Sequence, residues 1–472
     1  MTALLIDFGS TYTKLRAVAL EPARMLASAQ GPSTVASDVT VGMELAFADL
    51  EKRMGPLPDF SYRLACSSAG GGLRMVTVGL VKELTAEAAR QAALGAGARL
   101  VEAFAYQLTL EDTHRISQLV PDIILLAGGT DGGNTEVILA NARALAEAPI
   151  ECPIIVAGNR VAADNVHTIL RNAGNTAMVT ENVMPQFGVL NTEPARNAIR
   201  QVFIERIVHA KGIDRAQAMV DQVLMPTPAA VLEGARLVAD GHDNEDGLGS
   251  LLVVDIGGAT TDVHSVCAGE PSNEGVITQG LPEPYLKRTV EGDLGMRYNA
   301  PSIVDAIGLE RVASEAGLSP VRVTELTQHA CTNVETLPQN EDECAFEHVL
   351  ACCAARLAVQ RHAGTTETVY TVTGPVTVQR GKDLTEVKTL IGTGGGLARG
   401  EDAEALLATV LAEAAEPLSL RPRQPQLLFD RDYLLYGCGL LAGVEPEAAL
   451  ALAKAHLQPI GEQRPHDQTS LG

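Results

Sequence analysis

The sequence is poor in aromatic residues and contains no tryptophan. Phe, Tyr and Trp together make up 3% of its 472 residues, whereas hydrophobic residues, mainly Ala, Leu and Val, make up 46%. No apolar run reaches the roughly 18 residues that a membrane-spanning helix needs, and no basic segment precedes an apolar stretch at the N-terminus. We therefore expect a cytoplasmic α/β protein with no membrane partner, long enough for more than one domain.

Positive charge is also scarce. Lys and Arg number 36 against 58 Asp and Glu, which gives a formal net charge of −22 and an isoelectric point of about 4.9. Sequence-independent binding of nucleic acid needs a positive surface, so this charge balance excludes it. The eight cysteines show neither a CxxC pair nor zinc-ligand spacing, and we expect them to be buried thiols in a reducing compartment.

A strand followed by a glycine turn is indicated between residues 251 and 264, LLVVDIGGATTDVH. The initial apolar run is typical of a buried strand, and Gly257 and Gly258 allow a tight turn whose N–H groups can converge on phosphate oxygens. Asp255 ends this strand and Asp262 lies on the expected return strand, where carboxylates suit hydrated Mg²⁺. Taken alone, the stretch could also be an ordinary glycine-rich hairpin.

The same arrangement occurs near the N-terminus, in the sequence LLIDFGSTYTK. Asp7 ends an apolar strand, Gly9 allows the turn, and Ser10 and Thr11 add hydroxyl donors. Lys14 lies on the return strand. The repetition favours a phosphate-binding role for both hairpins over a chance match.

A third glycine segment, TLIGTGGGLAR, follows an expected strand at residues 389–399. Its residues Gly394, Gly395 and Gly396 offer a surface free of side chains, against which an adenine ring can stack. In the segment RTVEGDLGMR at residues 288–297, Gly292 and Gly295 can allow close approach of a nucleotide. Asp293, Arg288 and Arg297 either belong to that site or form only an ion-pair network.

Two other segments leave alternatives open. The loop GGTDGGN at residues 128–134 joins an expected strand to a helix, and it either binds a phosphate or a partner or only turns the chain. The segment PTPAAVLEGARLVADG, residues 226–241, is expected to form a helix whose small residues permit close packing against a second helix.

Two phosphate hairpins followed by a glycine segment resemble the actin, Hsp70 and sugar kinase superfamily. The resemblance implies an α/β actin-like ATPase fold, in which two lobes have duplicated ribonuclease-H-like mixed sheets, each of five strands. We expect lobe I at residues 1–245, with an α/β insertion at about 65–190. Lobe II is expected at 246–472, with a helical cap at about 286–364 and a last strand at 433–436.

This resemblance also implies a site for ATP or ADP with Mg²⁺. Asp7, Asp255 and Asp262 are expected to position hydrated Mg²⁺ and the attacking water, and Lys14 is expected to reach the terminal phosphates. The residues expected to bind the nucleotide are Gly9, Ser10, Thr11, Gly257, Gly258, Ala259, Thr260, Thr261, Gly292, Asp293, Gly394, Gly395 and Gly396.

Across nearly its whole length the chain resembles the MutL-type accessory proteins associated with glutamate mutase, which are unrelated to the mismatch-repair protein of that name. The segments that carry this likeness are DFGSTYTK, ILLAGGTDGGN, LLVVDIGGATTDVHSV, RTVEGDLGMR and IGTGGGLARG. The resemblance implies an ATP-dependent reactivating or chaperone-like factor whose partner is an adenosylcobalamin-dependent mutase or aminomutase. A homodimer is an oligomeric state to be tested.

Other functions remain as alternatives. A small-metabolite kinase and an actin-like filament protein share the superfamily, although the net charge disfavours self-association. Dehydratase activators share the ATP hairpins but carry an iron–sulfur cluster. The stretch from Asp262 through His264 to Cys267 also resembles the DxHxxG cobalamin motif, but Cys267 replaces its glycine and the stretch belongs to the phosphate hairpin.

One position departs from the Hsp70 pattern. Met225 stands where that pattern has a glutamate before the proline, and a thioether cannot accept a proton from the attacking water. Unless Asp221, Gln222 or another residue reaches the γ-phosphate, unaided hydrolysis is expected to be slow.

Overall fold

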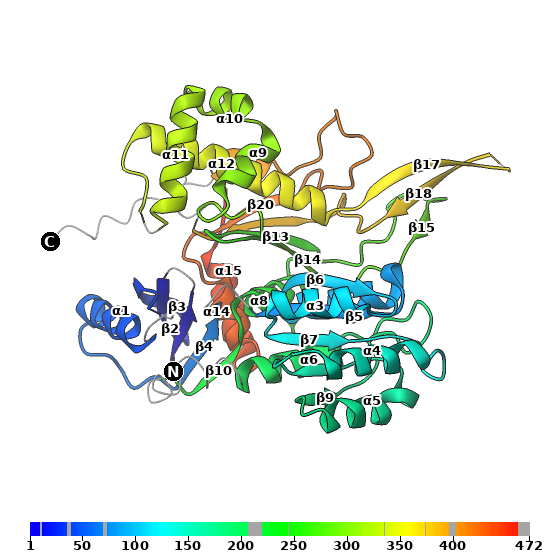
Figure 1. Ribbon diagram of the computed structural model, residues 1–472. Helices are drawn as coiled ribbons and strands as arrows, with labels where there is room; N and C mark the ends of the chain where they lie inside the picture. Colours follow the sequence, from blue (N-terminus) through cyan, green and yellow to red (C-terminus); the bar gives the residue numbers. More distant parts are fainter. Residues whose placement is uncertain are drawn as a thin grey trace.

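The computed structural model describes residues 1–9, 12–34, 39–68, 73–205, 220–243, 245–334, 336–372, 374–395 and 403–460. Ser10, Thr11 and Gly396, all expected at the nucleotide, lie outside the described residues. Within the described part, two mixed sheets and an inserted parallel sheet surround a central group of helices (Figure 1). No helix in these ranges is both long enough and apolar enough to cross a membrane.

The first mixed sheet has the strand order β10-β4-β1-β2-β3. Strands β1, β2 and β3 form an antiparallel meander, and β4 and β10 add in parallel on the other side of β1. Helix α1 (Val39–Met54) covers one face, where Met43 packs with Leu4 and Ile6. The strands are β1 (Thr2–Phe8), β2 (Tyr12–Leu20), β3 (Ala23–Pro32), β4 (Tyr62–Ser67) and β10 (Gln222–Pro226).

The second mixed sheet repeats this topology. Its order is β16-β14-β13-β19-β20-β21, with an antiparallel meander on one side of β13 and parallel strands β19 and β20 on the other. The duplication confirms the expected α/β actin-like fold with two ribonuclease-H-like sheets, but five strands is wrong for this sheet because antiparallel β21 extends its edge. The strands are β13 (Leu251–Ile256), β14 (Thr261–Val266), β16 (Leu286–Glu291), β19 (Thr389–Thr393), β20 (Gln426–Asp430) and β21 (Leu457–Pro459).

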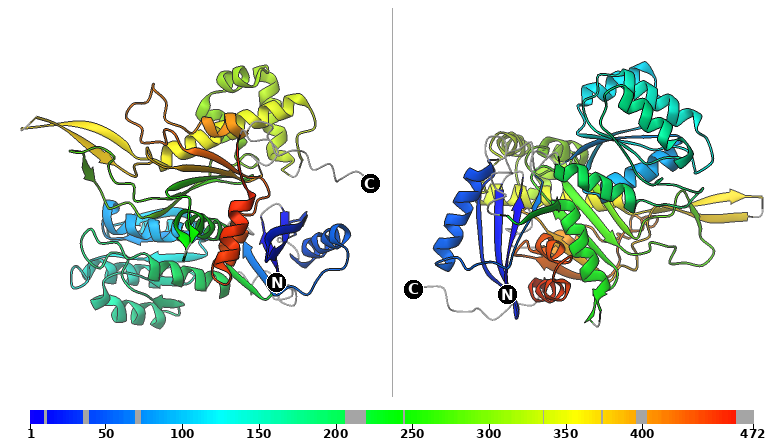
Figure 2. Two further views of the ribbon diagram at one scale, coloured as in Figure 1. Left: turned by 180° about the vertical axis from the view of Figure 1, so that it is seen from behind. Right: turned by 90° about the horizontal axis from the view of Figure 1, so that it is seen from below.

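Three helices fill the layer between the two mixed sheets (Figure 2). They are α8 (Thr227–Asp240), α14 (Leu435–Leu441) and α15 (Pro446–His456). The alternating side chains of each central strand divide between two cores. Ala3 and Leu5 of β1, and Leu251 and Val253 of β13, all face this shared helical layer. The layer therefore joins the two lobes through a single apolar core.

The expected strand at residues 433–436 is wrong. The chain leaves the sheet at Asp430, whose carboxylate accepts the backbone N–H groups of Leu434 and Leu435 at 2.8 and 3.0 Å. An aspartate that satisfies the first free N–H groups stabilises a helix start, so the apolar residues that follow form α14.

An inserted α/β unit lies between β4 and β10. Its five strands are all parallel in the order β6-β5-β7-β8-β9, and they pack on an apolar core of their own. The strands are β5 (Arg74–Gly79), β6 (Arg99–Ala105), β7 (Ile123–Leu126), β8 (Ile154–Val156) and β9 (Ala177–Val179). The helices are the π-helix η1 (Lys82–Ala86), α2 (Glu87–Gly95), α3 (Leu110–Leu119), α4 (Glu136–Glu147), α5 (Arg160–Asn172) and α6 (Glu193–Phe203). The proposed domain boundaries themselves stay predictions.

A helical cluster and a β-ribbon complete the C-terminal half. The helices are α9 (Ala300–Ile307), α10 (Leu309–Ala316), α11 (Pro320–Thr332), α12 (Glu341–His362) and α13 (Ala403–Ala408). They cover the face of the second sheet that points away from α8 (Figure 1). The remaining strands are β11 (Gly241–His242), β12 (Glu245–Asp246), β15 (Ile277–Gln279), β17 (Thr365–Thr371) and β18 (Gly374–Arg380).

Candidate functional site

The two sequence hairpins have the same turn. The N–H of Gly9 donates to the carbonyl of Tyr12 at 3.1 Å, and the N–H of Gly257 donates to the carbonyl of Thr260 at 2.9 Å. A Cβ at Gly9 would lie 2.5 Å from the Tyr12 oxygen, and one at Gly257 would lie 2.9 Å from the Thr260 oxygen. Both turns therefore need glycine, because any larger residue would push the returning strand away.

The register places equivalent side chains on equivalent faces. Asp7 pairs with Lys14 across β1 and β2, and Asp255 pairs with Asp262 across β13 and β14. Alternation along each strand puts Asp7 on the face of Leu5 and Asp255 on the face of Val253, which is the face of the shared helical layer. The structure thus brings these sequence-predicted residues to one region between the lobes.

Asp7 is almost fully buried and has three polar neighbours. Its Oδ1 accepts a hydrogen bond from Thr227 Oγ1 at 2.7 Å, at the first residue of α8. Its Oδ2 lies 3.5 Å from Lys14 Nζ, and Cys66 Sγ lies 3.7 Å from Oδ1. Burial, followed by the charge of Asp7, raises the pKa of the Cys66 thiol, so this cysteine stays protonated. The carboxylate of Asp7 is therefore held at the carboxyl end of β1 in a fixed orientation.

Tyr433 is a site residue that sequence reasoning missed. Lys14 Nζ lies 3.5 Å from the centre of its ring, a cation–π contact that holds the ammonium group. Tyr433 has a φ of 49°, in the left-handed region that a bulky residue rarely adopts. Burial and then the nearby charges of Asp255 and Asp7 raise the pKa of its hydroxyl well above its usual value. Tyr433 therefore lies between the two hairpins and close to both aspartates.

Asp255 is held in an unfavourable environment for a carboxylate. Burial and the neighbouring Asp262 raise its pKa to about 7, and Lys14 opposes the rise. Gly394 lies directly against it, because a Cβ at that position, where φ is 98°, would be 2.5 Å from Asp255 Oδ1. The third glycine segment thus meets the second hairpin at Asp255, while a Cβ at Gly395 would meet open space.

Asp262 has a different set of contacts. Its Oδ1 forms an ion pair with Arg288 at 2.8 Å, and its Oδ2 accepts a hydrogen bond from Thr260 at 3.1 Å. The same guanidinium donates to the carbonyl oxygens of Leu94 and Ala98, both at 3.1 Å, at the end of α2 in the inserted unit. Arg288 therefore links the second hairpin to the inserted unit.

The segment at 292–299 packs on the turn of the second hairpin. Gly295 is needed there, because a Cβ would overlap the backbone of Ala259, and Asn299 Nδ2 donates to the Ala259 carbonyl at 3.1 Å. Asp293 instead pairs with Arg361 at 2.7 Å, which lowers the pKa of that carboxyl. Gly292 lies near the side chain of Arg99.

A further carboxylate, that of Asp430, lies at the end of β20 on the face of the second sheet that meets the shared helical layer. Besides capping α14, it accepts a hydrogen bond from Thr393 Oγ1 at 2.9 Å, and burial raises its pKa. Within the ranges described above, no three acidic, histidine or cysteine side chains converge closely enough to chelate a bare cation.

The glycine loop at 128–134 is fixed by two buried asparagines. Asn159 Oδ1 accepts the N–H of Gly132 at 3.1 Å, and its Nδ2 donates to the carbonyls of Gly133 and Asn134. Asn182 Nδ2 donates to the Asp131 carboxylate at 2.9 Å. These bonds account for the loop as a rigid turn, and no described contact points to a ligand there.

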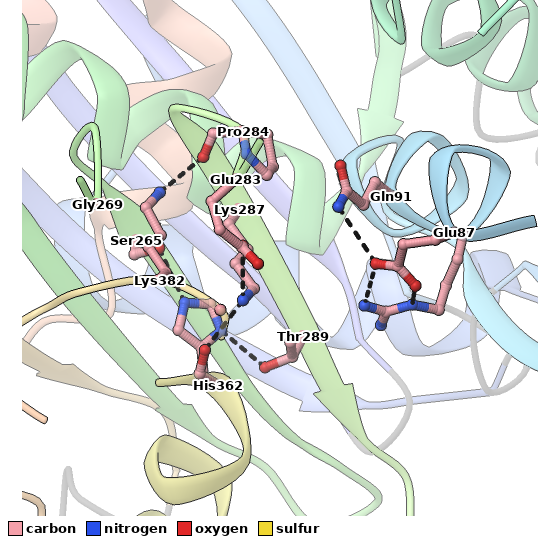
Figure 3. A network of polar contacts seen from close by, with 12 residues as sticks. Glu87, Gln91, Ser265, Gly269, Glu283, Pro284, Lys287, Thr289, His362 and Lys382 are labelled. Atoms are coloured by element: carbon pink, nitrogen blue, oxygen red, sulfur yellow. Dashed lines mark hydrogen bonds and ion pairs between the residues drawn. The ribbon is translucent and has the colours of Figure 1, made fainter. Parts of the chain in front are cut away.

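A buried polar network supports β16, the strand that carries Arg288 (Figure 3). His362, at the end of α12, lies 2.8 Å from Ser265 Oγ and 2.9 Å from Thr289 Oγ1, so both ring nitrogens have partners. Burial lowers the pKa of His362 well below its usual value, which keeps the ring neutral. Lys382 Nζ donates to the carbonyls of Pro284 and Tyr285. The network fastens the edge of the second sheet.

His264, part of the cobalamin-like stretch, is completely buried within β14. Burial and the charge of Arg288 lower its pKa well below the usual value. Because the His264 ring is completely buried, it cannot reach the cobalt of a bound cobalamin, and the structure offers no support for cobalamin binding at this stretch.

The residue before Pro226, at the end of β10, is not acidic. Met225 pairs with Cys66 across β10 and β4 and packs against the shared core. Asp221 lies at the amino end of β10, where its carboxylate accepts the N–H of Arg63 at 2.8 Å, at the far end of the strand from the hairpins. The side chain of Gln222 lies outside the described residues.

Comparison with known proteins supplies the family. The profile of the MutL protein family matches residues 3–457. A curated relative, Protein MutL of Clostridium tetanomorphum, is 47% identical over 455 residues, which cover 96% of this chain and 98% of the relative. The chain belongs to the MutL family. This finding confirms the resemblance read from the sequence motifs, and the MutL family meant here is not the mismatch-repair one.

Two solved structures are remotely similar to this MutL family member. A glycerol dehydratase reactivase has a TM-score of 0.34 at 9% identity, with 94% of this chain and 99% of the other covered. A xylulose kinase from Rhodospirillum rubrum has a TM-score of 0.33 at 12% identity, with 99% and 95% covered. The fold of this chain is defined by its duplicated sheet topology.

Proposed function

We propose that this protein binds MgATP between its two hairpins and acts as an ATP-dependent reactivating factor for an adenosylcobalamin-dependent mutase. One observation carries the nucleotide site. Two Asp-x-Gly turns with the same backbone hydrogen bond face one layer, with Lys14 and Tyr433 between their aspartates. Duplicated turns of this kind suit a ligand that has several phosphates.

Each part of the site has a separate task in this proposal. The N–H groups around Gly9 and Gly257 bind phosphate oxygens, and Lys14 offsets their charge. Asp7 and Asp255 orient the waters of Mg²⁺, and the bound ion neutralises phosphate charge. Gly394 keeps the space beside Asp255 free of side chains. Asp262, paired with Arg288, couples the conformation of the second hairpin to that of the inserted unit.

Asp255→Asn is predicted to stabilise the ligand-free protein at pH 8. A folded-state pKa of about 7, above the ordinary value near 3.8, means that folding loses stability as pH rises between those values. Removing the charge should therefore raise Tm by about 2–4 °C at pH 8, and by less at pH 5. Thermal unfolding at both pH values, with and without MgATP, measures the effect.

Asp293→Asn is the matched control for this prediction, because the hydrogen bond with Arg361 lowers the pKa of Asp293. That variant should not gain stability. An equal gain for Asp255→Asn at pH 5 and pH 8, or no gain at all, would contradict the electrostatic account. Asp255→Asn should also lose most of the stabilisation that MgATP gives the wild type.

Met225→Glu is predicted to raise basal ATP hydrolysis without improving ATP affinity. A well-placed general base contributes roughly 10²- to 10⁴-fold, and an acid introduced without optimisation should supply a small part of it, about threefold to tenfold. Steady-state phosphate release measures the rate, and Met225→Gln, which has similar size but no basicity, is the control. A wild-type turnover of about 10 per second, which is typical of enzymes, would contradict the expectation that unaided ATP hydrolysis is slow.

Reactivation of a mutase tests the proposed partner. A cobalamin-dependent mutase inactivated by its own turnover should recover activity when this protein and MgATP are added, and should not recover with Lys14→Met. Recovery that needs no nucleotide would overturn the ATP-dependent role. Failure to reactivate any glutamate mutase or aminomutase, together with efficient phosphorylation of a small metabolite, would favour a kinase.

A further inference from the structure

We propose that Arg99, supplied by the inserted unit, binds the terminal phosphate of ATP and makes the site prefer ATP to ADP. This inference rests on the proposed nucleotide site and adds a residue that the sequence motifs did not indicate. Arg99 is the first residue of β6, directly after the loop at residues 96–98 that joins α2 to this strand. Its side chain is exposed.

One side of the loop at residues 96–98 touches the helix that holds Asp7. A Cβ at Gly97, where φ is 89°, would lie 2.8 Å from Pro226 Cβ. The next residue, Thr227, begins α8 and donates its hydroxyl to the Asp7 carboxylate at 2.7 Å. The inserted unit therefore contacts the residues that position the aspartate of the first hairpin.

The other side of the loop touches the ion-pair partner of Asp262. The Ala98 carbonyl accepts a hydrogen bond from Arg288 at 3.1 Å, and Arg288 pairs with Asp262 at 2.8 Å. The N–H of Arg99 donates to the Leu73 carbonyl at 2.7 Å, within the inserted unit. The backbone of Arg99 is therefore fixed close to the second hairpin, on an element that also touches the residues around the first.

The Arg99 guanidinium occupies space that Gly292 leaves open. A Cβ at Gly292 would lie 3.2 Å from Arg99 Nη2 and 3.5 Å from its Nε. Glu291 is opposite Thr261 in the pairing of β16 with β14, so Gly292 comes beside Thr260, in the turn of the second hairpin. The guanidinium thus lies next to a turn whose N–H groups are proposed to bind phosphate.

This guanidinium is on the same side of the second sheet as Asp262. Side chains alternate along β16, so Gly292 follows Arg288, the partner of Asp262, in facing one side. Glu291 faces the other side, where its carboxylate pairs with Arg361 at 2.7 Å. A ligand that reaches the turn from the side of Asp262 therefore comes within range of Arg99.

The donors of Arg99 are available for such a ligand. In the ranges that the structure describes, its side chain forms neither a hydrogen bond nor an ion pair, because the nearby acids have other partners. Asp262 is bonded to Arg288, and Glu291 is bonded to Arg361. An exposed guanidinium has five N–H donors and no acceptor, so an incoming anion is the partner that suits it.

Among the groups of a nucleotide, the terminal phosphate suits Arg99 best. A guanidinium is planar and always charged, and it bonds two phosphate oxygens at once. Lys14 lies beside the first hairpin and Arg99 beside the second, so the two cations flank a phosphate chain held between the turns. ADP lacks the third phosphate, so the contact depends on ATP.

Arg99 also acts during hydrolysis. The oxygen of water forms a bond to the γ-phosphorus, the bond from that phosphorus to the bridging oxygen breaks, and ADP leaves with the electron pair. The proton lost by the water is taken up by the released phosphate. Charge shifts over the oxygens of the transferred group and of ADP, where a guanidinium offsets it.

Titration calorimetry of full-length Arg99→Ala tests the nucleotide preference. The two ligands are ADP and the ATP analogue in which an imido group replaces the β–γ bridging oxygen, both in Mg²⁺. Hydrogen bonds to a charged group contribute about 10- to 100-fold to an affinity, so we expect a loss of this size for the analogue. The affinity for ADP should stay within about twofold of the wild type, which also shows that the variant is folded.

Phosphate release at saturating ATP tests the role in hydrolysis. Arg99→Ala should be at least about tenfold slower than the wild type. Arg99→Lys keeps the charge without the planar fork, so it should recover part of the affinity and little of the rate. Arg115→Ala is the matched control, because Arg115 is an exposed arginine of the same unit that pairs with Glu102 at 3.0 Å. It should bind and hydrolyse ATP like the wild type.

The outcomes separate this inference from the proposed function. A loss of affinity for the analogue alone, in Arg99→Ala and not in Arg115→Ala, would support the role of Arg99. Equal losses for both ligands, or an Arg99→Ala variant that matches the wild type in both assays, would overturn that role and leave the nucleotide site standing. A wild type that binds neither ligand would overturn the proposed function and this inference together.

Discussion

Lys14→Met is expected to weaken MgATP binding by about 10- to 100-fold, since hydrogen bonds to charged groups contribute about 1.5–3 kcal/mol. The ammonium group lies between the Asp7 carboxylate and the face of the Tyr433 ring, beside the turn of the first hairpin. Methionine keeps a flexible, unbranched side chain of nearly the same length and removes the charged ammonium group with its N–H donors. Calorimetric titration with ATP in Mg²⁺ measures the loss, and an affinity within threefold of the wild type would contradict the assignment of Lys14.

Substitutions of Tyr433 separate positioning from contact with the nucleotide. Tyr433→Phe keeps the ring and its cation–π contact, so it should bind MgATP like the wild type. Tyr433→Leu removes the ring, and the freed Lys14 should lose part of its effect. If the two variants behave alike, the ring does not position Lys14.

Gly439→Ala is expected to destabilise the whole protein by about 3 kcal/mol or more, at the upper end of overpacking costs. A Cβ at Gly439 in α14 would overlap the carbonyl oxygen of Ala230 in α8, and one at Gly234 would overlap the carbonyl of Leu435. The backbones of the two helices therefore touch. Because these helices fill the layer between the lobes, the added methyl should separate the lobes and also weaken nucleotide binding.

Gly443→Ala is the control for this helix contact. Gly443 lies just after α14, its Cβ would meet no atom within 4 Å, and its backbone is not left-handed. The free energy of unfolding of the Gly443→Ala variant should differ from that of the wild type by no more than about 0.5 kcal/mol. Chemical denaturation of both variants gives the comparison, and equal stability of Gly439→Ala and the wild type would show that α8 and α14 do not pack as described.

The two hairpins and the fold class could be predicted from sequence because their signals are local. An apolar strand, an aspartate at its end and a glycine two residues later are read directly from residues 4–14 and 251–264. The duplicated order of the sheets then follows from the superfamily resemblance. The functional roles of the expected site residues stay predictions until nucleotide binding is measured.

Other parts of the site depend on tertiary contacts that no local pattern contains. Tyr433 begins a run of apolar and aromatic residues that is typical of a strand, and only the capping by Asp430 turns it into a helix start. The ion pair of Asp262 with Arg288 joins the neighbouring strands β14 and β16. The need for glycine at position 439 comes from contact with α8, which lies far away in the sequence. A weak sequence signal did exist for Asp430, because aspartate is a preferred residue at the start of a helix.

The central claim is that both hairpins form a single MgATP site, and calorimetric titration of the wild type with ATP in Mg²⁺ and in EDTA tests it most directly. We expect one nucleotide per chain, with micromolar or weaker affinity that falls at least about tenfold in EDTA. Asp7→Asn and Asp255→Asn should each abolish the difference between the two conditions. A wild type that binds no nucleotide, or aspartate variants that keep the full Mg²⁺ dependence, would contradict the site.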